Sequence, residues 1–127
     1  MKISELVKVA HENALSKGFW DDYNRIAFDP KDKIEETYLD NLNNNAIATR
    51  LALIHSEVSE ALEALRKDDA DNFAEELADV VIRVADLAGG LEIDLEGEIE
   101  RKMEKNKARG YKHGKLFRGG DINITDT

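Results

Sequence analysis

The sequence predicts an all-α protein: a helical bundle of four main helices that assembles as a homo-oligomer. Apolar residues recur at helical spacing through most of the 127 residues, and Pro30 is the only proline that interrupts them. Helices are expected at about residues 4–17, 46–67, 70–88 and 94–108. Because each has only a narrow apolar stripe, one chain makes a thin core, which pairing of subunits would complete.

The first expected helix is followed by a less regular stretch. The helix ends before Gly18, and its stripe is Ile3, Leu6, Val7, Ala10 and Ala14. Residues 18–45 are less regular, with a short helix expected at about residues 33–42, and a stretch this long between helices is often functional. Trp20, the single tryptophan, could stack on a nucleobase or close the core of the bundle, and the two roles are compatible.

The two central helices carry the strongest pattern. Their stripes are Ile47, Leu51, Ile54, Val58, Ala61, Leu62 and Leu65 in one, and Phe73, Leu77, Val80, Val84 and Leu87 in the other. A turn at residues 67–69 joins them, so they are expected to pack antiparallel. Gly89 and Gly90 are expected to stop the second helix.

Two acidic pairs lie beside these stripes. Glu57 and Glu60 each precede a stripe residue by one position, and Glu76 and Asp79 do the same on the next helix. Because residues three apart share a helix face, two antiparallel helices can bring all four carboxylates into one groove. Converging negative charges repel unless cations neutralise them, and Mg²⁺ takes oxygen ligands of this kind. The pattern therefore predicts a magnesium site, with Mn²⁺ as an alternative cation.

The alternative for any one pair is a charged, solvated surface, because the chain has 27 acidic residues. Two pairs at the same offset from two consecutive stripes favour the metal site. Glu63 and Glu75 lie further toward solvent and are expected to be surface carboxylates. His55 is expected to be a partly buried polar residue, and His113 is equally suited to a phosphate contact and to a surface position.

The last expected helix leads into a basic segment. The helix carries an apolar stripe at Leu95, Ile99 and Met103. Three polar residues share the face beside it, Lys102, Asn106 and Arg109. Residues 101–118 contain eight Lys or Arg and one acidic residue, which suits a polyphosphate, although a solvated patch or a dimer contact would have the same composition. Residues 1–118 are expected to form one domain and residues 119–127 a flexible tail.

Composition excludes several classes of function. The net charge is −9, which argues against general nucleic-acid binding. The lack of cysteine excludes disulfides and thiolate metal sites. No apolar run approaches the roughly 20 residues that span a membrane, and residues 1–5 show no signal-peptide pattern. A soluble cytoplasmic protein is expected.

Acidic metal ligands, basic residues and an aromatic residue together predict a site for a nucleoside triphosphate. The chemistry would be metal-assisted hydrolysis, in which cations polarise a phosphoryl group, lower the pKa of a water and shield the leaving group. No Ser, Cys or His nucleophile is required.

The motif spacing resembles that of the MazG-like nucleoside triphosphate pyrophosphohydrolases. The resemblance covers about residues 46–115 and is carried by HSEVSEALEAL, FAEELADVVIRVADLAG and KMEKNKARGYKHGK. It implies an all-α fold related to dimeric dUTPases and phosphoribosyl-ATP pyrophosphohydrolase, with subunits that pair to build the active site. It also implies cleavage between the α- and β-phosphates, which yields a nucleoside monophosphate and pyrophosphate and removes unwanted nucleotides from the pool.

The resemblance assigns roles to individual residues. The metal ligands and catalytic residues would be Glu57, Glu60, Glu76 and Asp79, and one of the glutamates would orient the attacking water. The residues that contact substrate would be Lys102, Asn106, Arg109, Tyr111, Lys115 and, against the base, Trp20.

Two alternatives stay open. The first is a related pyrophosphohydrolase that is specific for dUTP or phosphoribosyl-ATP. The second is a non-catalytic acidic helical interaction module, which would neither bind Mg²⁺ at residues 57–79 nor turn over any nucleotide.

Overall fold

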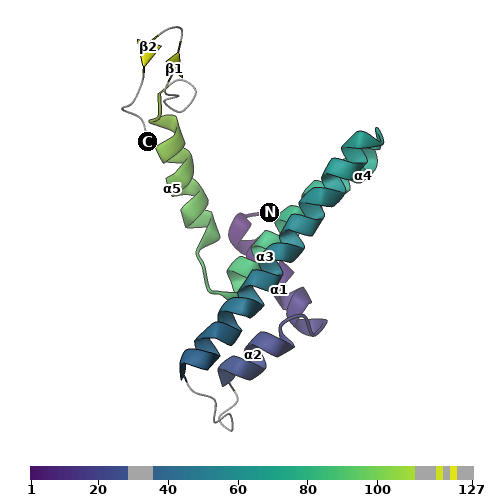
Figure 1. Cartoon of the computed structure of the whole chain (residues 1–127), viewed down its shortest axis with the longest axis vertical. Coiled ribbons are helices and arrows are strands. Elements are labelled where there is room, and N and C mark those ends of the chain that lie inside the picture. Colours follow the sequence, from purple (N-terminus) through teal and green to yellow (C-terminus); the bar gives the residue numbers. More distant parts are fainter. Residues whose placement is uncertain (29–35, 111–116, 119–120, 123–127) are drawn as a thin grey trace. The chain divides into compact units, whose positions relative to one another are not determined.

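The structure is a computed structural model and describes residues 1–28, 36–110, 117–118 and 121–122 (Figure 1). The described elements are α1 (Ile3–Ser16), α2 (Asp21–Phe28), α3 (Glu36–Arg66), α4 (Ala70–Gly90), α5 (Leu95–Lys107), β1 (Phe117–Arg118) and β2 (Asp121–Ile122). Helices dominate, so the all-α class is confirmed. The contacts within the chain divide it into two compact units, Met1–Ile93 and Asp94–Thr127.

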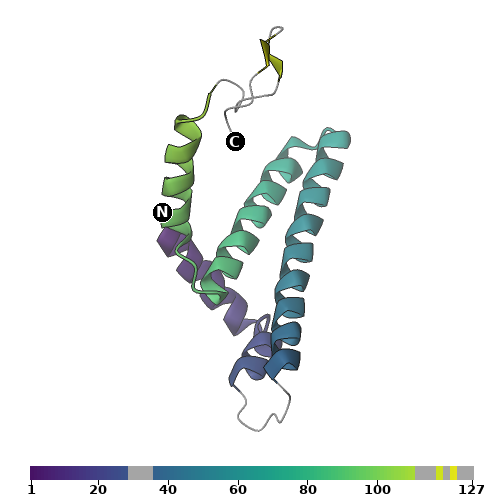
Figure 2. The ribbon, with the colours of Figure 1, turned by 60° about the vertical axis from the view of Figure 1, so that its left-hand side comes forward.

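The first unit is built on a hairpin of α3 and α4 (Figure 2). The turn between them has Asp68 at a positive φ of 55°. Asp69 then caps α4, because its side chain accepts a hydrogen bond of 3.1 Å from the backbone N–H of Asn72. The short turn makes the two helices run in opposite directions, as the sequence predicts.

Helix α1 packs against α4, and α2 packs against α3. His11 and Trp20 approach α4 closely at two glycines. A Cβ on Gly89 would lie 2.6 Å from Cβ of His11, and a Cβ on Gly90 would lie 2.1 Å from the ring of Trp20. The helix ends at this glycine pair, as expected: α4 includes both glycines and its last residue is Gly90. The missing side chains also admit α1 and Trp20.

The core of this unit consists mainly of alanine. The buried apolar residues among those described are Ala10, Ala14, Trp20, Ala46, Ala61, Ala64, Ala85 and Ala88. Several large residues of the expected stripes instead lie outside, including Val58 (50 % exposed), Leu62 (57 %) and Leu77 (48 %). Small side chains let helix backbones approach closely, and the larger neighbours are then left on the outer surface.

Residues 18–45 contain more helix than the sequence analysis expects. Residues 21–28 form α2, which has Asp21 and Asp22 in its first turn, where negative charge is favourable. Helix α3 spans 31 residues from Glu36, so the expected short helix and the central helix are one element. Asparagine lowers helix propensity only modestly, and packing of α2 against α3 outweighs this cost.

The second unit contains α5 and a small hairpin. Asp94 caps α5 by accepting a hydrogen bond of 3.1 Å from the backbone N–H of Gly97. Strands β1 and β2 pair antiparallel, with Phe117 opposite Ile122 and Arg118 opposite Asp121. Residues 121–122, which belong to the expected tail, therefore form β2, and the expected domain boundary at residue 118 stays a prediction.

Candidate metal and nucleotide site

Three of the four predicted acidic ligands meet between α3 and α4. One carboxylate oxygen from each of Glu57, Glu76 and Asp79 lies within 4.8 Å of the others. These three residues are called the acidic cluster below. Glu60 lies one turn along α3 from Glu57, is exposed, and does not belong to this group of three, although its charge raises the pKa of Glu76.

The carboxyl groups of Glu57 and Glu76 interact directly. The pKa of Glu76 is raised to about 7, first because its protonated form donates a hydrogen bond to Glu57, and further because of burial and the negative charges of Glu57, Asp79 and Glu60. The same hydrogen bond, together with Arg83, lowers the pKa of Glu57. At neutral pH, Glu57 is therefore ionised while Glu76 is partly protonated.

The acidic cluster has the donor chemistry of a divalent-cation site. All its donors are carboxylate oxygens, which hard cations take as ligands. Oε2 of Glu76 is buried and has no hydrogen-bond partner among the described residues, although buried acceptors are usually satisfied. A cation at this position would supply that partner and relieve the repulsion between carboxylates. The residues present thus fit Mg²⁺ or Mn²⁺.

Arg83 connects the acidic cluster to its surroundings. Its Nε donates a hydrogen bond of 2.9 Å to Oε1 of Glu57, which forms an ion pair between α4 and α3. The sequence analysis does not identify this residue. The signal was available, because Arg83 follows Asp79 by four positions and Glu76 by seven, so the three share one face of α4.

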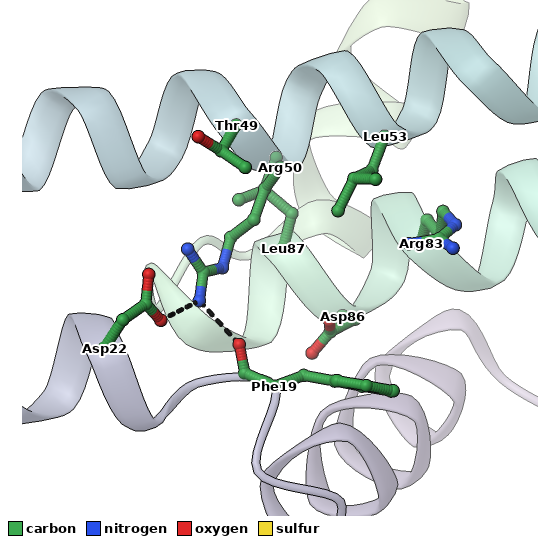
Figure 3. Close-up of a pocket in the computed structure, with 8 residues that line it drawn as sticks. All are labelled: Phe19, Asp22, Thr49, Arg50, Leu53, Arg83, Asp86 and Leu87. Carbon is green, nitrogen blue, oxygen red and sulfur yellow. Dashed lines mark hydrogen bonds and ion pairs between the residues drawn. The ribbon is translucent and has the colours of Figure 1, made fainter.

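Two adjoining pockets lie beside the cluster. A pocket of about 330 Å³, called the acidic pocket, includes Glu57 and Asp79 in its wall. A pocket of about 440 Å³, called the Arg50 pocket, is lined by Phe19, Asp22, Thr49, Arg50, Leu53, Arg83, Asp86 and Leu87 (Figure 3). The two pockets share Phe19, Arg83 and Asp86. The acidic pocket thus contains residues of the acidic cluster as well as the aromatic side chain of Phe19.

A comparison with protein-family models matches residues 45–113 to the MazG nucleotide pyrophosphohydrolase domain. The matched segment is more than half of the chain. This chain belongs to the MazG family. The searches of the curated proteins and of the solved structures gave no match.

Trp20, which precedes the matched segment, is a core residue. Its side chain is 1 % exposed, its Nε1–H donates a 2.7 Å hydrogen bond to Oδ1 of Asp86, and the guanidinium of Arg50 lies 4.0 Å from the ring centroid. The structure thus gives Trp20 the core role, and stacking on a base would require the ring to be uncovered. Phe19 is 67 % exposed and lines both pockets, so it is the aromatic side chain that faces them.

Asp86 joins α4 to the segment that carries Trp20. Besides the bond from Trp20, its Oδ1 lies 3.0 Å from Nδ1 of His11. Since an ionised carboxylate only accepts, Nδ1 of His11 carries the hydrogen. Arg50 fixes the same segment from α3, because it donates to the backbone oxygen of Phe19 at 2.7 Å and to Asp22 at 2.8 Å (Figure 3). Both pockets are therefore held together by hydrogen bonds across four helices.

The predicted phosphate-contacting residues of the MazG domain lie in the second unit or outside the described residues. Lys102 and Asn106 are exposed on α5, and Arg109 follows that helix. Nε of Arg109 is buried without a hydrogen-bond partner among the described residues. Tyr111 and Lys115, like His113, lie outside the described residues. The part that these residues take in substrate binding stays a prediction.

Three other expectations concern single residues near the acidic cluster. Glu63 is a surface carboxylate that pairs with Arg66 at 3.9 Å and Lys67 at 3.8 Å, and Glu75 is exposed, as expected. His55 is exposed rather than partly buried, because it lies on the outer face of α3. In the part of the chain that the structure describes, no helix has both the length and the hydropathy to cross a membrane.

Proposed function

We propose that this MazG-family protein hydrolyses (deoxy)nucleoside triphosphates between the α- and β-phosphates, with Mg²⁺ as cofactor, to give a nucleoside monophosphate and pyrophosphate. The observation that supports this proposal most is the convergence of Glu57, Glu76 and Asp79 within 4.8 Å beside pockets that reach the exposed ring of Phe19. Carboxylates suit the cation that accompanies a polyphosphate, and an aromatic ring suits a base.

Glu57, Glu76 and Asp79 would hold Mg²⁺ or Mn²⁺, and Glu60 is the proposed fourth ligand at the exposed edge of the cluster. The cation supplies positive charge that polarises a phosphoryl group. One of the glutamates of the cluster would also orient the attacking water.

The nucleoside would lie along Phe19 in the Arg50 pocket, whose volume of about 440 Å³ suits a nucleoside. Trp20 would support Phe19 from the core. The proposed phosphate contacts from the C-terminal part of the chain are Lys102, Asn106, Arg109, Tyr111 and Lys115, which rest on the resemblance of this segment to the family.

We also propose that the protein forms a homodimer or a dimer of dimers. The support is the set of large apolar residues on the outer surface of α3 and α4, among them Val58, Leu62, Leu65 and Leu77. A second copy would remove this apolar area from water. The proposed role is removal of unwanted nucleotides in the cytoplasm, without nucleic acid or membrane as partner.

The test is a panel of ribo- and deoxynucleoside triphosphates, dUTP and phosphoribosyl-ATP included, with Mg²⁺, in which release of pyrophosphate and monophosphate is measured. The wild type is compared with Asp79→Asn, and with Glu63→Gln as the matched control, since Glu63 pairs with the surface cations Arg66 and Lys67 at the end of its own helix. Loss of a cation ligand should lower kcat/KM at least roughly a hundredfold, because even residues that merely orient ligands cost 10–100-fold.

Each outcome of the panel has a distinct meaning. Release of pyrophosphate from several triphosphates supports the proposal, and turnover of dUTP or phosphoribosyl-ATP alone would replace it with the narrower specificity. No turnover of any nucleotide would favour a non-catalytic interaction module, and equal, measurable rates for Asp79→Asn and wild type would exclude the acidic cluster as the catalytic site.

A further inference from the structure

Arg83 provides a positive charge directly against the acidic cluster. Its Nε lies 2.9 Å from Oε1 of Glu57, and the side chain of Glu57 is 16 % exposed whereas that of Arg83 is 42 % exposed. The carboxylate is thus held in place, while the guanidinium reaches it from the solvent side. An ion pair of this kind can exchange partners without unpacking the helices.

A divalent cation and the guanidinium of Arg83 would compete for Glu57. Both are attracted to the same carboxylate, and two positive charges at that distance repel each other. Entry of a cation at the acidic cluster therefore weakens the bond between Arg83 and Glu57. The guanidinium then needs another anionic partner.

The pockets show where that partner would lie. Arg83 is one of three residues that line both the acidic pocket and the Arg50 pocket, and Figure 3 shows its place in the Arg50 pocket. Asp86, the acidic residue on the wall they share, already accepts hydrogen bonds from Trp20 and His11. A phosphate oxygen in either pocket would offer the guanidinium a charge-assisted hydrogen bond, which arginine forms readily.

We propose that Arg83 is an exchangeable positioning residue: it pairs with Glu57 in the cation-free protein and transfers to a phosphate oxygen of the substrate when a divalent cation binds the acidic cluster. This proposal rests on the proposed function of the cluster. It makes cation entry and substrate binding depend on each other through one side chain.

The experiment measures binding rather than turnover, in wild type, Arg83→Gln and Arg83→Lys, with Arg66→Gln as control. Arg66 pairs with Glu63 on the surface of the same hairpin, away from the cluster. Mn²⁺ alone is titrated by electron paramagnetic resonance, and then an α,β-methylene deoxynucleoside triphosphate is titrated by calorimetry at saturating Mn²⁺. Circular dichroism verifies that each variant is helical.

We expect Arg83→Gln to bind Mn²⁺ roughly tenfold more tightly than wild type, because a like charge has been removed. The same variant should bind the nucleotide analogue roughly tenfold more weakly, the loss expected of one hydrogen bond between charged groups. Arg83→Lys keeps the charge but not the two-pronged set of donors, so its affinity for each ligand should lie between those of wild type and Arg83→Gln. Arg66→Gln should match wild type.

The failures are distinguishable. If wild type binds no Mn²⁺, the proposed metal site is wrong, and the proposed role of Arg83 is wrong as well. If wild type binds Mn²⁺ but Arg83→Gln binds it no more tightly, or binds the nucleotide analogue as well as wild type does, the exchange by Arg83 is overturned while the metal site stands.

Discussion

Glu57 on α3 and Glu76 on α4 bring their carboxylate oxygens within 4.8 Å of each other, and the pKa values of the two groups move in opposite directions. The pKa of Glu76 rises to about 7, while that of Glu57 falls below its ordinary value. Two carboxyl groups in contact cannot both ionise without repulsion, so one retains a proton. Helix packing therefore brings together groups that tolerate each other only with a proton or a cation between them.

The stability of the cation-free protein should depend on the ionisation of Glu76. Because its pKa is about 7 in the folded protein and 4.5 ordinarily, Glu76 contributes stability that is fully present below pH 4.5 and is lost as the pH rises through 7. Glu76→Gln keeps an N–H donor for Glu57 and cannot ionise. In EDTA, the difference in thermal midpoint, variant minus wild type, should grow from pH 5 to pH 8.

Glu57 contributes in the other direction, since a lowered pKa gives stability that is lost only as the pH falls below the ordinary value of 4.5, which lies outside the range from pH 5 to pH 8. Glu63→Gln serves as control and should track the wild type at every pH. A difference between Glu76→Gln and wild type that is the same at pH 5 and pH 8 would contradict the shared proton.

Addition of Mg²⁺ or Mn²⁺ should raise the thermal midpoint, and more so at pH 8 than at pH 6. A ligand that binds only the folded state stabilises it by mass action, and below the pKa of about 7 the cation must displace the proton of Glu76. Asp79→Asn should largely abolish the shift. Glu60→Gln should reduce it less, because Glu60 lies outside the group of three oxygens within 4.8 Å. Equal shifts in Asp79→Asn and wild type would exclude Asp79 as a ligand.

The acidic cluster could be predicted from the sequence because it depends on local periodicity. Once α3 and α4 are helices joined by a short turn, the offsets of Glu57, Glu76 and Asp79 from their apolar neighbours set the direction of each side chain. The separation of Glu60 from the other three depends on the distance between the helices, and alanines such as Ala61 and Ala64 set that distance. The periodicity of the sequence does not predict this distance between the helices.

The pockets could not be predicted, because they depend on contacts between residues far apart in the chain. Asp86 accepts a hydrogen bond from Trp20, 66 positions away, and Arg50 donates one to the backbone oxygen of Phe19, 31 positions away. A half-buried aspartate such as Asp86 has the same local sequence pattern whether its carboxylate faces water or a distant indole. The close packing at Gly90 could not be predicted for the same reason, since it depends on the ring of Trp20 rather than on neighbouring residues of the helix.

Asp86 should stabilise the first unit through its two acceptor contacts. Asp86→Ala leaves Nε1–H of Trp20 and Nδ1 of His11 without their partner, which should lower the free energy of unfolding by roughly 1–3 kcal/mol. Asp86→Asn retains one carbonyl oxygen and should cost less. Urea unfolding followed by fluorescence of Trp20 measures both.

The control for this prediction is Glu75→Ala, which removes an exposed carboxylate from the same helix and should change the free energy of unfolding by no more than about 0.5 kcal/mol. If Asp86→Ala were as stable as Glu75→Ala, the hydrogen bonds of Asp86 would contribute nothing to the fold, and the carboxylate would be free to serve the pockets instead.

The outer face of α3 should be an interface between copies of the chain. Leu62 on α3 is 57 % exposed and Val9 on α1 is 56 % exposed in a single chain, so the two sites differ in location rather than in exposure. Leu62→Glu places a charge where a second copy would bury apolar surface, and should lower the molar mass measured by light scattering after size-exclusion chromatography. Val9→Glu should leave the mass unchanged. A wild type that is monomeric at all concentrations, or a Leu62→Glu variant with the wild-type mass, would mean that this apolar face is covered by something other than a second copy.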